Sequence, residues 1–251
     1  MKFEIDKQVR QVASEQVVEP DGIKRTLGTI HAEVGVFMAG EVNRQVRRQA
    51  NIKATPREIW ERVIRIYFEQ YGLTELANEI SATTVSDINR IIFENQLTGR
   101  PITEIMGFIE NLGYSSIRAE RIARTEIAKS SGTGSMVGAL STGLETVKEW
   151  ISARDARTRR LPKDQFDHFH MDGRKANVDG FFQVPSKLGV PEQALYPGDP
   201  NLSAGNVINC RCTTGYEVVR GASGRPQRIQ SPPMGQAGVI YQILQSQNAI
   251  A

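Results

Sequence analysis

Four dense polar clusters, spread over the stretch from Arg118 to Cys212, constrain this chain more than any other feature. They read RAERIARTE (Arg118–Glu126), KEWISARDARTR (Lys148–Arg159), HFHMDG (His168–Gly173) and NCRC (Asn209–Cys212). Each is rich in charged residues, Cys, His or Trp. If the fold brings the clusters together, they form one compact polar centre, and the role of that centre becomes the question of function.

The composition favours a soluble globular protein. A net charge of +3 over 251 residues tolerates a nucleic-acid partner without requiring one. No apolar run approaches the ~20 residues of a membrane span, and the first residues lack a signal peptide's apolar core, so we expect cytoplasmic synthesis and no membrane partner. A disulfide between Cys210 and Cys212 would be strained, which favours reduced thiols or a shared ligand role.

Helical periodicity dominates the first half. The residues before 50 are expected to be helical, with a basic face that we interpret as solvated surface, formed by Arg44, Arg47 and Arg48. A helix is predicted to begin at Thr55–Glu58, and others lie within 84–99, within 101–113, and from Ser115 or Ser116 to about Leu140. The last helix contains small residues that indicate either close backbone approach or a break: Gly132, Gly134, Ser135 and Gly138.

The second half is predicted to contain strands and long loops. Alternation over 146–151 is typical of a half-buried strand, and 213–219 should form a second strand. Residues 155–206 should form a long ordered excursion. Beyond Gly221 an extended basic arm is expected, which orders on binding and docks through its apolar residues 238–244. The predicted class is α+β: a helical N-terminal half, a small mixed α/β domain with a short sheet and long ordered loops, and an extended C-terminal arm.

The first two clusters allow alternative interpretations. Arg124 and Glu126 either reach across to Asp155 and the excursion or belong to a solvated helix face. Asp155 should accept a hydrogen bond from the backbone two residues further on. Arg157 and Arg159 either bind phosphate or carboxylate groups, or pair locally with acidic residues of the same loop, which we favour.

The third cluster suggests metal chemistry. In a strand, His168, His170 and Asp172 would share one face, as in the H-x-H-x-D motif of metallohydrolases. Gly173 stands where a further histidine would be needed. The alternative is that His168 donates to a loop carbonyl while Asp172 and Gly173 form a turn.

The NCRC cluster precedes a strand. Asn209 should close the preceding loop through its side chain, with Cys210 and Cys212 facing the core and Arg211 outward. Nothing in the pattern indicates a depressed thiol pKa, and a cysteine protease would need a base and an orienting group that the sequence does not reveal. We therefore expect no resident metal or cofactor, with zinc on His168, His170, Cys210 and Cys212 as the alternative.

Taken in order, these motifs resemble those of one known family. IARTE, K-x-W with a D-x-R-T-R turn, H-x-x-M-D-G, and a Pro197–Pro200 segment before NCRC are together similar to the phage Mu F-like head morphogenesis family of minor head proteins. The resemblance covers roughly residues 85–220. It assigns a structural role to the following positions: Arg124, Glu126, Trp150, Asp155, Arg157, Arg159, His168, Asp172, Gly173, Asn209, Cys210 and Cys212.

The resemblance implies a virion component inside the head near the portal vertex, acting in head morphogenesis and in DNA packaging or ejection. Many relatives carry a C-x-x-C pair after the D-x-R-T turn; this chain has none there, which favours a clasp over a zinc centre. The implied partners are the portal protein, the inner capsid surface and packaged DNA, met by the basic arm and the arginine-bearing helix.

We therefore expect a structural protein with no enzymatic activity. Its predicted regions are a helical part (1–82), the head morphogenesis domain (83–220) and the C-terminal arm (221–251). The alternative is an enzyme, either a metal-dependent nuclease or hydrolase or an ADP-ribosyltransferase-like protein, centred on His168, Asp172 and Arg124 with His170. A plain DNA-binding protein is a third interpretation, and it predicts affinity that falls steeply with salt.

Overall fold

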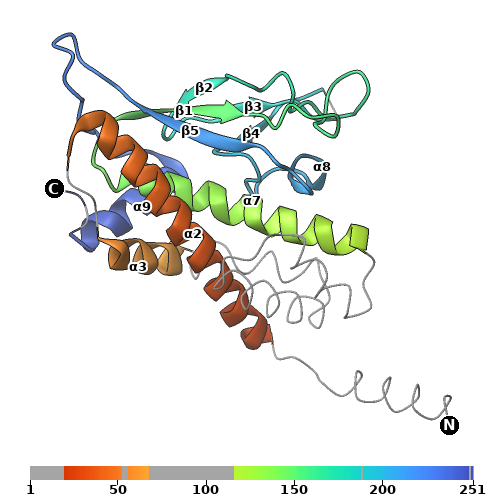
Figure 1. Ribbon diagram of the computed structural model, residues 1–251, viewed down its shortest axis with the longest axis horizontal. Helices are drawn as coiled ribbons and strands as arrows, with labels where there is room; N and C mark the ends of the chain where they lie inside the picture. The colour runs from red at the N-terminus through yellow and green to blue at the C-terminus, as the bar shows by residue number, and fades with distance from the viewer. Residues whose placement is uncertain (1–19, 53–55, 68–115, 188, 249, 251) are drawn as a thin grey trace.

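Helices and a small antiparallel sheet form two layers. The computed structural model describes residues 20–52, 56–67, 116–187, 189–248 and 250. In this part of the chain the longer helices are α2 (Pro20–Ala50), α3 (Arg57–Tyr67), α7 (Ser116–Leu140) and α9 (Gly235–Ser246), and they lie on one side of the sheet (Figure 1). The predicted α+β class is confirmed.

The sheet has β1 (Thr146–Ile151) at its centre, between β2 (Lys175–Asn177) and β5 (Thr213–Val218). Both pairings are antiparallel, and Trp150 lies opposite Thr214. The alternation predicted for this strand is observed, because Thr146, Lys148 and Trp150 are all buried. The predicted excursion is ordered, and it contains β2, the hairpin of β3 (Phe182–Val184) and β4 (Glu192–Ala194), and the short helix α8 (Ala204–Val207).

Small residues let α2 and α7 approach each other closely. A Cβ atom added to Gly134 would lie 2.2 Å from the carbonyl oxygen of Gly35, and one added to Gly138 would lie 2.3 Å from that of Ala39. The helix α7 continues unbroken past these glycines. Of the two predicted explanations for them, close backbone approach is therefore the one observed.

A polar network is buried at the same helix crossing. The Asn43 amide donates to the Ser141 hydroxyl at 2.8 Å, and the Trp60 indole donates to it at 3.1 Å. This network joins α2, α3 and the end of α7. The helix α3 begins at Arg57, close to its predicted start. The helices predicted within 84–99 and 101–113 lie outside the described residues.

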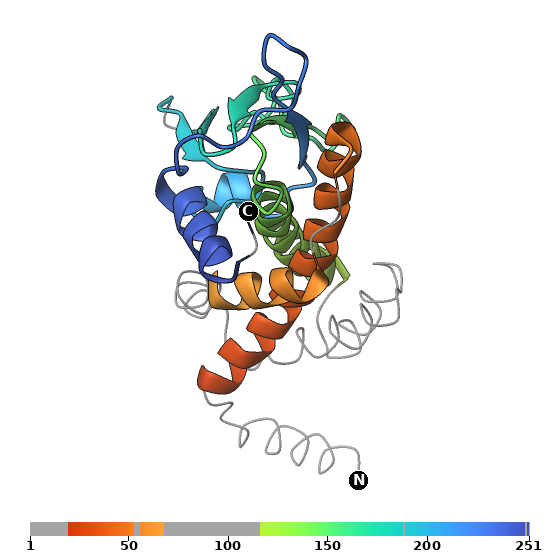
Figure 2. The ribbon, with the colours of Figure 1, turned by 90° about the vertical axis from the view of Figure 1, so that its left-hand side faces the viewer.

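The C-terminal segment differs from the predicted arm. The chain first turns back on itself at 221–225, where Arg220 and Pro226 form an antiparallel bridge. The residues that follow are bonded to the body of the protein, for example by the Ile229 amide, which donates to the Gly143 carbonyl at 3.1 Å. The helix α9 follows and packs against α3 and α7, as Figure 2 shows from the side. Ile240 and Leu244 are fully buried in the main core. The docking predicted for 238–244 is thus observed, but it needs no partner, because the chain's own helices cover the apolar face.

The basic face of α2 is only partly solvated. Arg44 and Arg48 are exposed, as predicted. Arg47 instead turns inward, where its guanidinium donates to the Ser141 carbonyl at 3.3 Å. Burial, followed by the nearby charge of Arg228, lowers its pKa. In the described part of the chain, no helix combines the length and apolarity that a bilayer crossing requires.

Candidate functional site

Residues of the second, third and fourth clusters meet in one small core beside the sheet. The ring of Trp150 from β1 lies edge-on to the ring of His168, with their centroids 5.4 Å apart. The Sγ atom of Cys210 lies 3.5 Å from His168 Nδ1, and that of Cys212 lies 3.7 Å from it. We call His168, Cys210 and Cys212 the thiol–imidazole cluster.

The first cluster joins this centre through Thr125. Its hydroxyl accepts a hydrogen bond from the Asn209 backbone amide at 2.8 Å and donates to the Arg121 carbonyl at 2.7 Å. Asn209 has a left-handed backbone, with φ 58. The prediction that its side chain closes the loop is therefore wrong, because its backbone amide makes the link. The sequence did not single out Thr125, since a threonine inside a charged helix carries no distinctive pattern.

Arg124 and Glu126 do not supply the link to Asp155. Glu126 is buried and pairs with Lys129 on its own helix at 3.1 Å, while Arg124 is half-buried on α7. Asp155 pairs instead with Arg211 of the NCRC cluster. Arg211 is consequently half-buried and not directed outward as predicted.

The Asp155 turn has the predicted local geometry. Its Oδ1 atom accepts hydrogen bonds from the Arg157 amide and the Thr158 hydroxyl, each at 3.0 Å. The pKa of Asp155 is lowered. Partial desolvation would raise this pKa, but the Thr158 hydrogen bond and the Arg211 charge together outweigh desolvation. Arg159 donates to the carbonyl oxygen of Ile208, which ties the turn to the residues before NCRC. The turn thus fastens one loop to another within the chain.

The H-x-H-x-D side chains do not share one face, because residues 168–173 form a turn and not a strand. His168 Nε2 lies 3.0 Å from Asn206 Oδ1, whereas His170 is exposed and its Nδ1 lies 2.7 Å from Asp167 Oδ2. The prediction that His168 donates to a loop carbonyl is therefore corrected to a side-chain amide.

Asp172 contacts other residues than those that His168 and His170 contact. It accepts from the Ser152 amide at 2.8 Å and from Arg154 at 2.9 Å. The Gly173 φ of +76 completes the predicted turn. The residues proposed for an H-x-H-x-D centre therefore have separate roles.

The pKa values of the two thiols are shifted in opposite directions. The Cys210 thiol donates to Cys212, and this hydrogen bond lowers the pKa of Cys212; desolvation opposes the shift and His168 adds to it. The pKa of Cys210 is raised, first by its bond to Cys212 and then by burial. The sequence showed no sign of a depressed thiol pKa, because the shift depends on contacts between residues distant in the chain.

Asn206 is a functional candidate that sequence reasoning missed. Its Oδ1 orients His168, so that the side chains form the order thiol, imidazole, amide. This order fits either an activated thiol or a metal cradle. Exposed fractions of 1% for His168, 2% for Cys210 and 8% for Cys212 favour a closed site, because a nucleophile must reach its substrate.

A buried lysine, Lys148, lies on the same face of β1 as Trp150. Lys148 has no exposed surface, and its Nζ donates to the Val178 carbonyl at 2.9 Å. Burial lowers its pKa to about 7, although Asp179 and Asp199 oppose the shift. Asp199 is also buried, which raises its pKa, and it accepts from the Leu195 amide at 2.7 Å. The alternation of 146–151 already placed Lys148 beside Trp150, which was the available signal.

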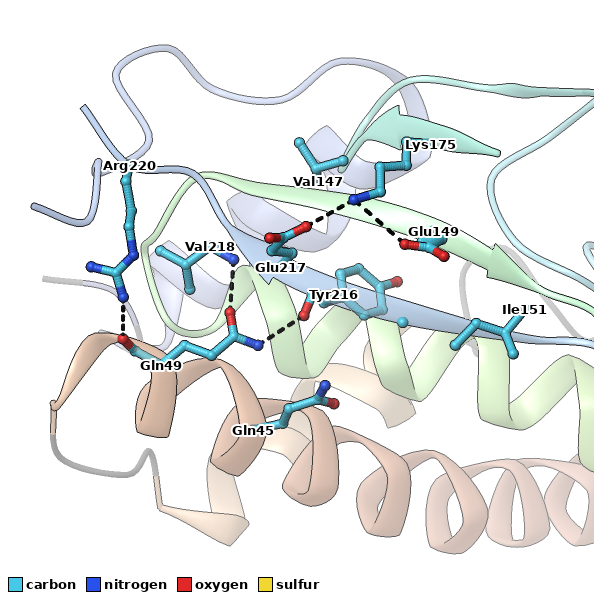
Figure 3. Close-up of a pocket in the computed structure, with 11 residues that line it drawn as sticks. Gln45, Gln49, Val147, Glu149, Ile151, Lys175, Tyr216, Glu217, Val218 and Arg220 are labelled. Carbon is cyan, nitrogen blue, oxygen red and sulfur yellow. Dashed lines mark hydrogen bonds and ion pairs between the residues drawn. The ribbon is translucent and has the colours of Figure 1, made fainter. Parts of the chain in front are cut away.

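A groove of about 790 Å³ separates the end of α2 from the sheet (Figure 3). Its polar side chains bond to other residues that line the groove. Gln49 Nε2 donates to the Tyr216 carbonyl at 3.1 Å, and Arg220 donates to the Gln49 carbonyl at 2.6 Å, which joins α2 to β5 and the residues after it. Lys175 of β2 pairs with Glu217 of β5 at 2.9 Å. We therefore assign the groove a structural role.

Comparison with protein-family models, with curated proteins and with solved structures finds no match to this chain.

Proposed function

We propose that this chain is a structural minor head protein of a tailed phage or phage-like particle, bound inside the head at or near the portal vertex. It would act in head morphogenesis or DNA delivery and would have no enzymatic activity. The basis is the ordered resemblance of its four motifs to the Mu F-like head morphogenesis family.

One structural observation supports a structural role for the motif residues. The residues that bear the resemblance hold the fold together: Asn209 bonds to Thr125, Arg211 pairs with Asp155, and Trp150 packs on His168. Motif residues used in this way support a scaffold, because these contacts join distant segments of the same chain. An enzyme centred on His168, Asp172 and Arg124 lacks comparable support, since His168 and Asp172 have separate partners.

The two basic segments identified in the sequence lie at one end of the molecule. Arg220 bonds to the backbone of Gln49 near the end of α2, and Arg228 lies close enough to Arg47 to lower its pKa. Arg48 and Arg225 are exposed on these segments. A concentration of cations of this kind favours an acidic partner surface or packaged DNA.

Particles of the source organism test this proposal. Density-gradient fractions should contain the chain together with DNA-filled particles, in far lower amount than the major capsid protein, as measured by quantitative mass spectrometry. Protease added to intact particles should leave it undigested. A chain found only among unassembled proteins, or digested on intact particles, would overturn the proposal.

Charge variants identify the docking face. Arg48→Glu with Arg225→Glu should reduce incorporation into particles, because both residues lie at the basic end. Lys163→Glu with Lys187→Glu makes the same change in charge at exposed positions of the excursion and should leave incorporation unchanged. Equal incorporation of both double variants would contradict the assignment of the basic end.

A further inference from the structure

We propose that His168, Cys210 and Cys212 bind a thiophilic divalent metal ion, with Zn²⁺ as the best fit, in a buried site with three protein ligands. This inference stands on the geometry of the three side chains. It does not depend on the proposed role in a phage head.

The spacing of the donor atoms fits a tetrahedral ion. Zinc lies about 2.3 Å from thiolate sulfur and about 2.0–2.1 Å from imidazole nitrogen, so a tetrahedron has sulfur–nitrogen edges of about 3.6 Å. The distances from His168 Nδ1 to the two sulfurs are 3.5 Å and 3.7 Å. All three donor atoms lie within 4.8 Å of one another. The two sulfur–nitrogen edges of such a tetrahedron are therefore already close to their expected length.

The orientation of His168 also favours ligation. The Nδ2 of Asn206 donates to the Pro185 carbonyl at 3.3 Å, which leaves its Oδ1 to face His168 Nε2 at 3.0 Å. Nε2 must therefore carry the proton, and Nδ1 presents its lone pair to the sulfurs. The imidazole also packs against the Trp150 ring, with the two ring planes at 79° to each other. A hydrogen bond of this kind to the distal nitrogen is the usual outer-shell support of a metal-bound histidine.

The C-x-C arrangement sends both sulfurs to one side. Arg211, between them, turns away to pair with Asp155, while Cys210 and Cys212 both point into the core. The short spacing of the two cysteines is compatible with ligation, because the histidine comes from another loop. Two thiolates and a neutral imidazole select soft or borderline ions over Mg²⁺ and Ca²⁺.

The charges of the ion and its ligands are compatible with a buried site. Binding displaces the thiol protons to solvent, and two thiolates then neutralise the divalent ion, so no net charge is added to the core. Three protein donors leave one tetrahedral position, which water or another small ligand takes.

The test uses the full chain, purified without chelators. Elemental analysis and native mass spectrometry should give equimolar zinc. Cobalt substitution should give thiolate-to-cobalt charge-transfer bands together with the intense visible absorption of a tetrahedral ion. If the wild-type chain shows neither equimolar zinc nor charge-transfer bands with cobalt, the proposal is overturned, whatever the variants show.

Variants assign the ligands. Cys210→Ser, Cys212→Ser and His168→Gln should each lose the equimolar metal, whereas His170→Gln, two positions away and exposed, should retain it. Asn206→Leu leaves the three donor side chains in place but removes the bond to His168 Nε2, together with the bond to the Pro185 carbonyl, and should weaken metal affinity about 10–100-fold. Loss of metal in His170→Gln with retention in His168→Gln would contradict the assignment.

Thiol labelling separates a metal site from an activated thiol. Iodoacetamide should leave both cysteines unmodified in the zinc-loaded protein and modify them after removal of zinc by a chelator. Rapid alkylation of a single cysteine with zinc still bound would indicate a free nucleophile and overturn the proposal.

Discussion

The backbone amide of Asn209 donates to the hydroxyl of Thr125 across 2.8 Å, although the two residues are 84 positions apart. This bond joins the central helix α7 to the CxC segment. The donor sits at a left-handed position, where the backbone has been bent so that its amide faces the helix. It is therefore the contact by which the helical layer holds the thiol–imidazole cluster in place.

Thr125→Val should test the strength of this contact. Valine keeps the shape of threonine but cannot accept the hydrogen bond, which leaves the half-buried Asn209 amide without its partner. We expect the free energy of unfolding to fall by about 1–3 kcal/mol. Urea unfolding measures the difference. Thr213→Val, at an exposed position of β5, is the matched control and should stay within about 0.5 kcal/mol of wild type.

An equal effect of the two substitutions would show that the loss at Thr125 reflects the threonine-to-valine change itself. In that case the bond to Asn209 would contribute nothing specific to stability.

The spacing of apolar residues was sufficient to predict those helices and strands that depend on the local sequence. The strand 146–151 and the helix ending at Leu140 follow from residues near each other in the chain. For the small residues of that helix the sequence left close approach and a break as alternatives, because the contact at Gly134 is with the distant Gly35. The partners of the cluster residues do not follow from the local sequence either. Asn206 orients His168, and Arg211 pairs with Asp155, because the excursion folds back over the sheet, and no local pattern encodes that path. The apparent H-x-H-x-D motif failed for the same reason, since a turn replaced the strand it requires.

Lys148 should make stability depend on pH. Its pKa is about 7 in the folded chain and 10.5 when unfolded, so between these values the unfolded state binds more protons. Stability should therefore rise with pH across this window, by on the order of 2 kcal/mol between pH 7 and pH 9. Lys148→Met should remove this part of the rise, measured as the difference from wild type in urea unfolding at both values.

Lys163→Met, at an exposed position, is the control for Lys148→Met and should retain the wild-type pH dependence. If Lys148→Met kept the full wild-type rise, the lysine would be charged in the folded protein near neutral pH. Comparison with the parent chain is needed because the Cys212 thiol, with its lowered pKa, also adds to the rise.

Gly134→Ala and Gly138→Ala should each destabilise the chain although alanine is the better helix former. The added Cβ atoms would meet backbone atoms of α2 at 2.2 Å and 2.3 Å, so the helices must separate. We expect losses of about 1–3 kcal/mol, where intrinsic propensity alone would give a gain of about 1 kcal/mol. Ser131→Ala, half-buried on the same helix, should be close to neutral. A gain in thermal stability at either glycine would mean that the two helices lie farther apart.

The C-terminal helix α9 should prove integral to folding. Leu244 is fully buried among residues of the helical layer, so Leu244→Ala should cost about 2–5 kcal/mol. Gln242→Ala, exposed on the same helix, should change little. Thermal unfolding followed by circular dichroism distinguishes this from a tail that folds only on a partner, for which both variants would match wild type. The sequence suggested such a tail because residues 220–234 are polar, but the apolar residues that follow find their core within the same chain.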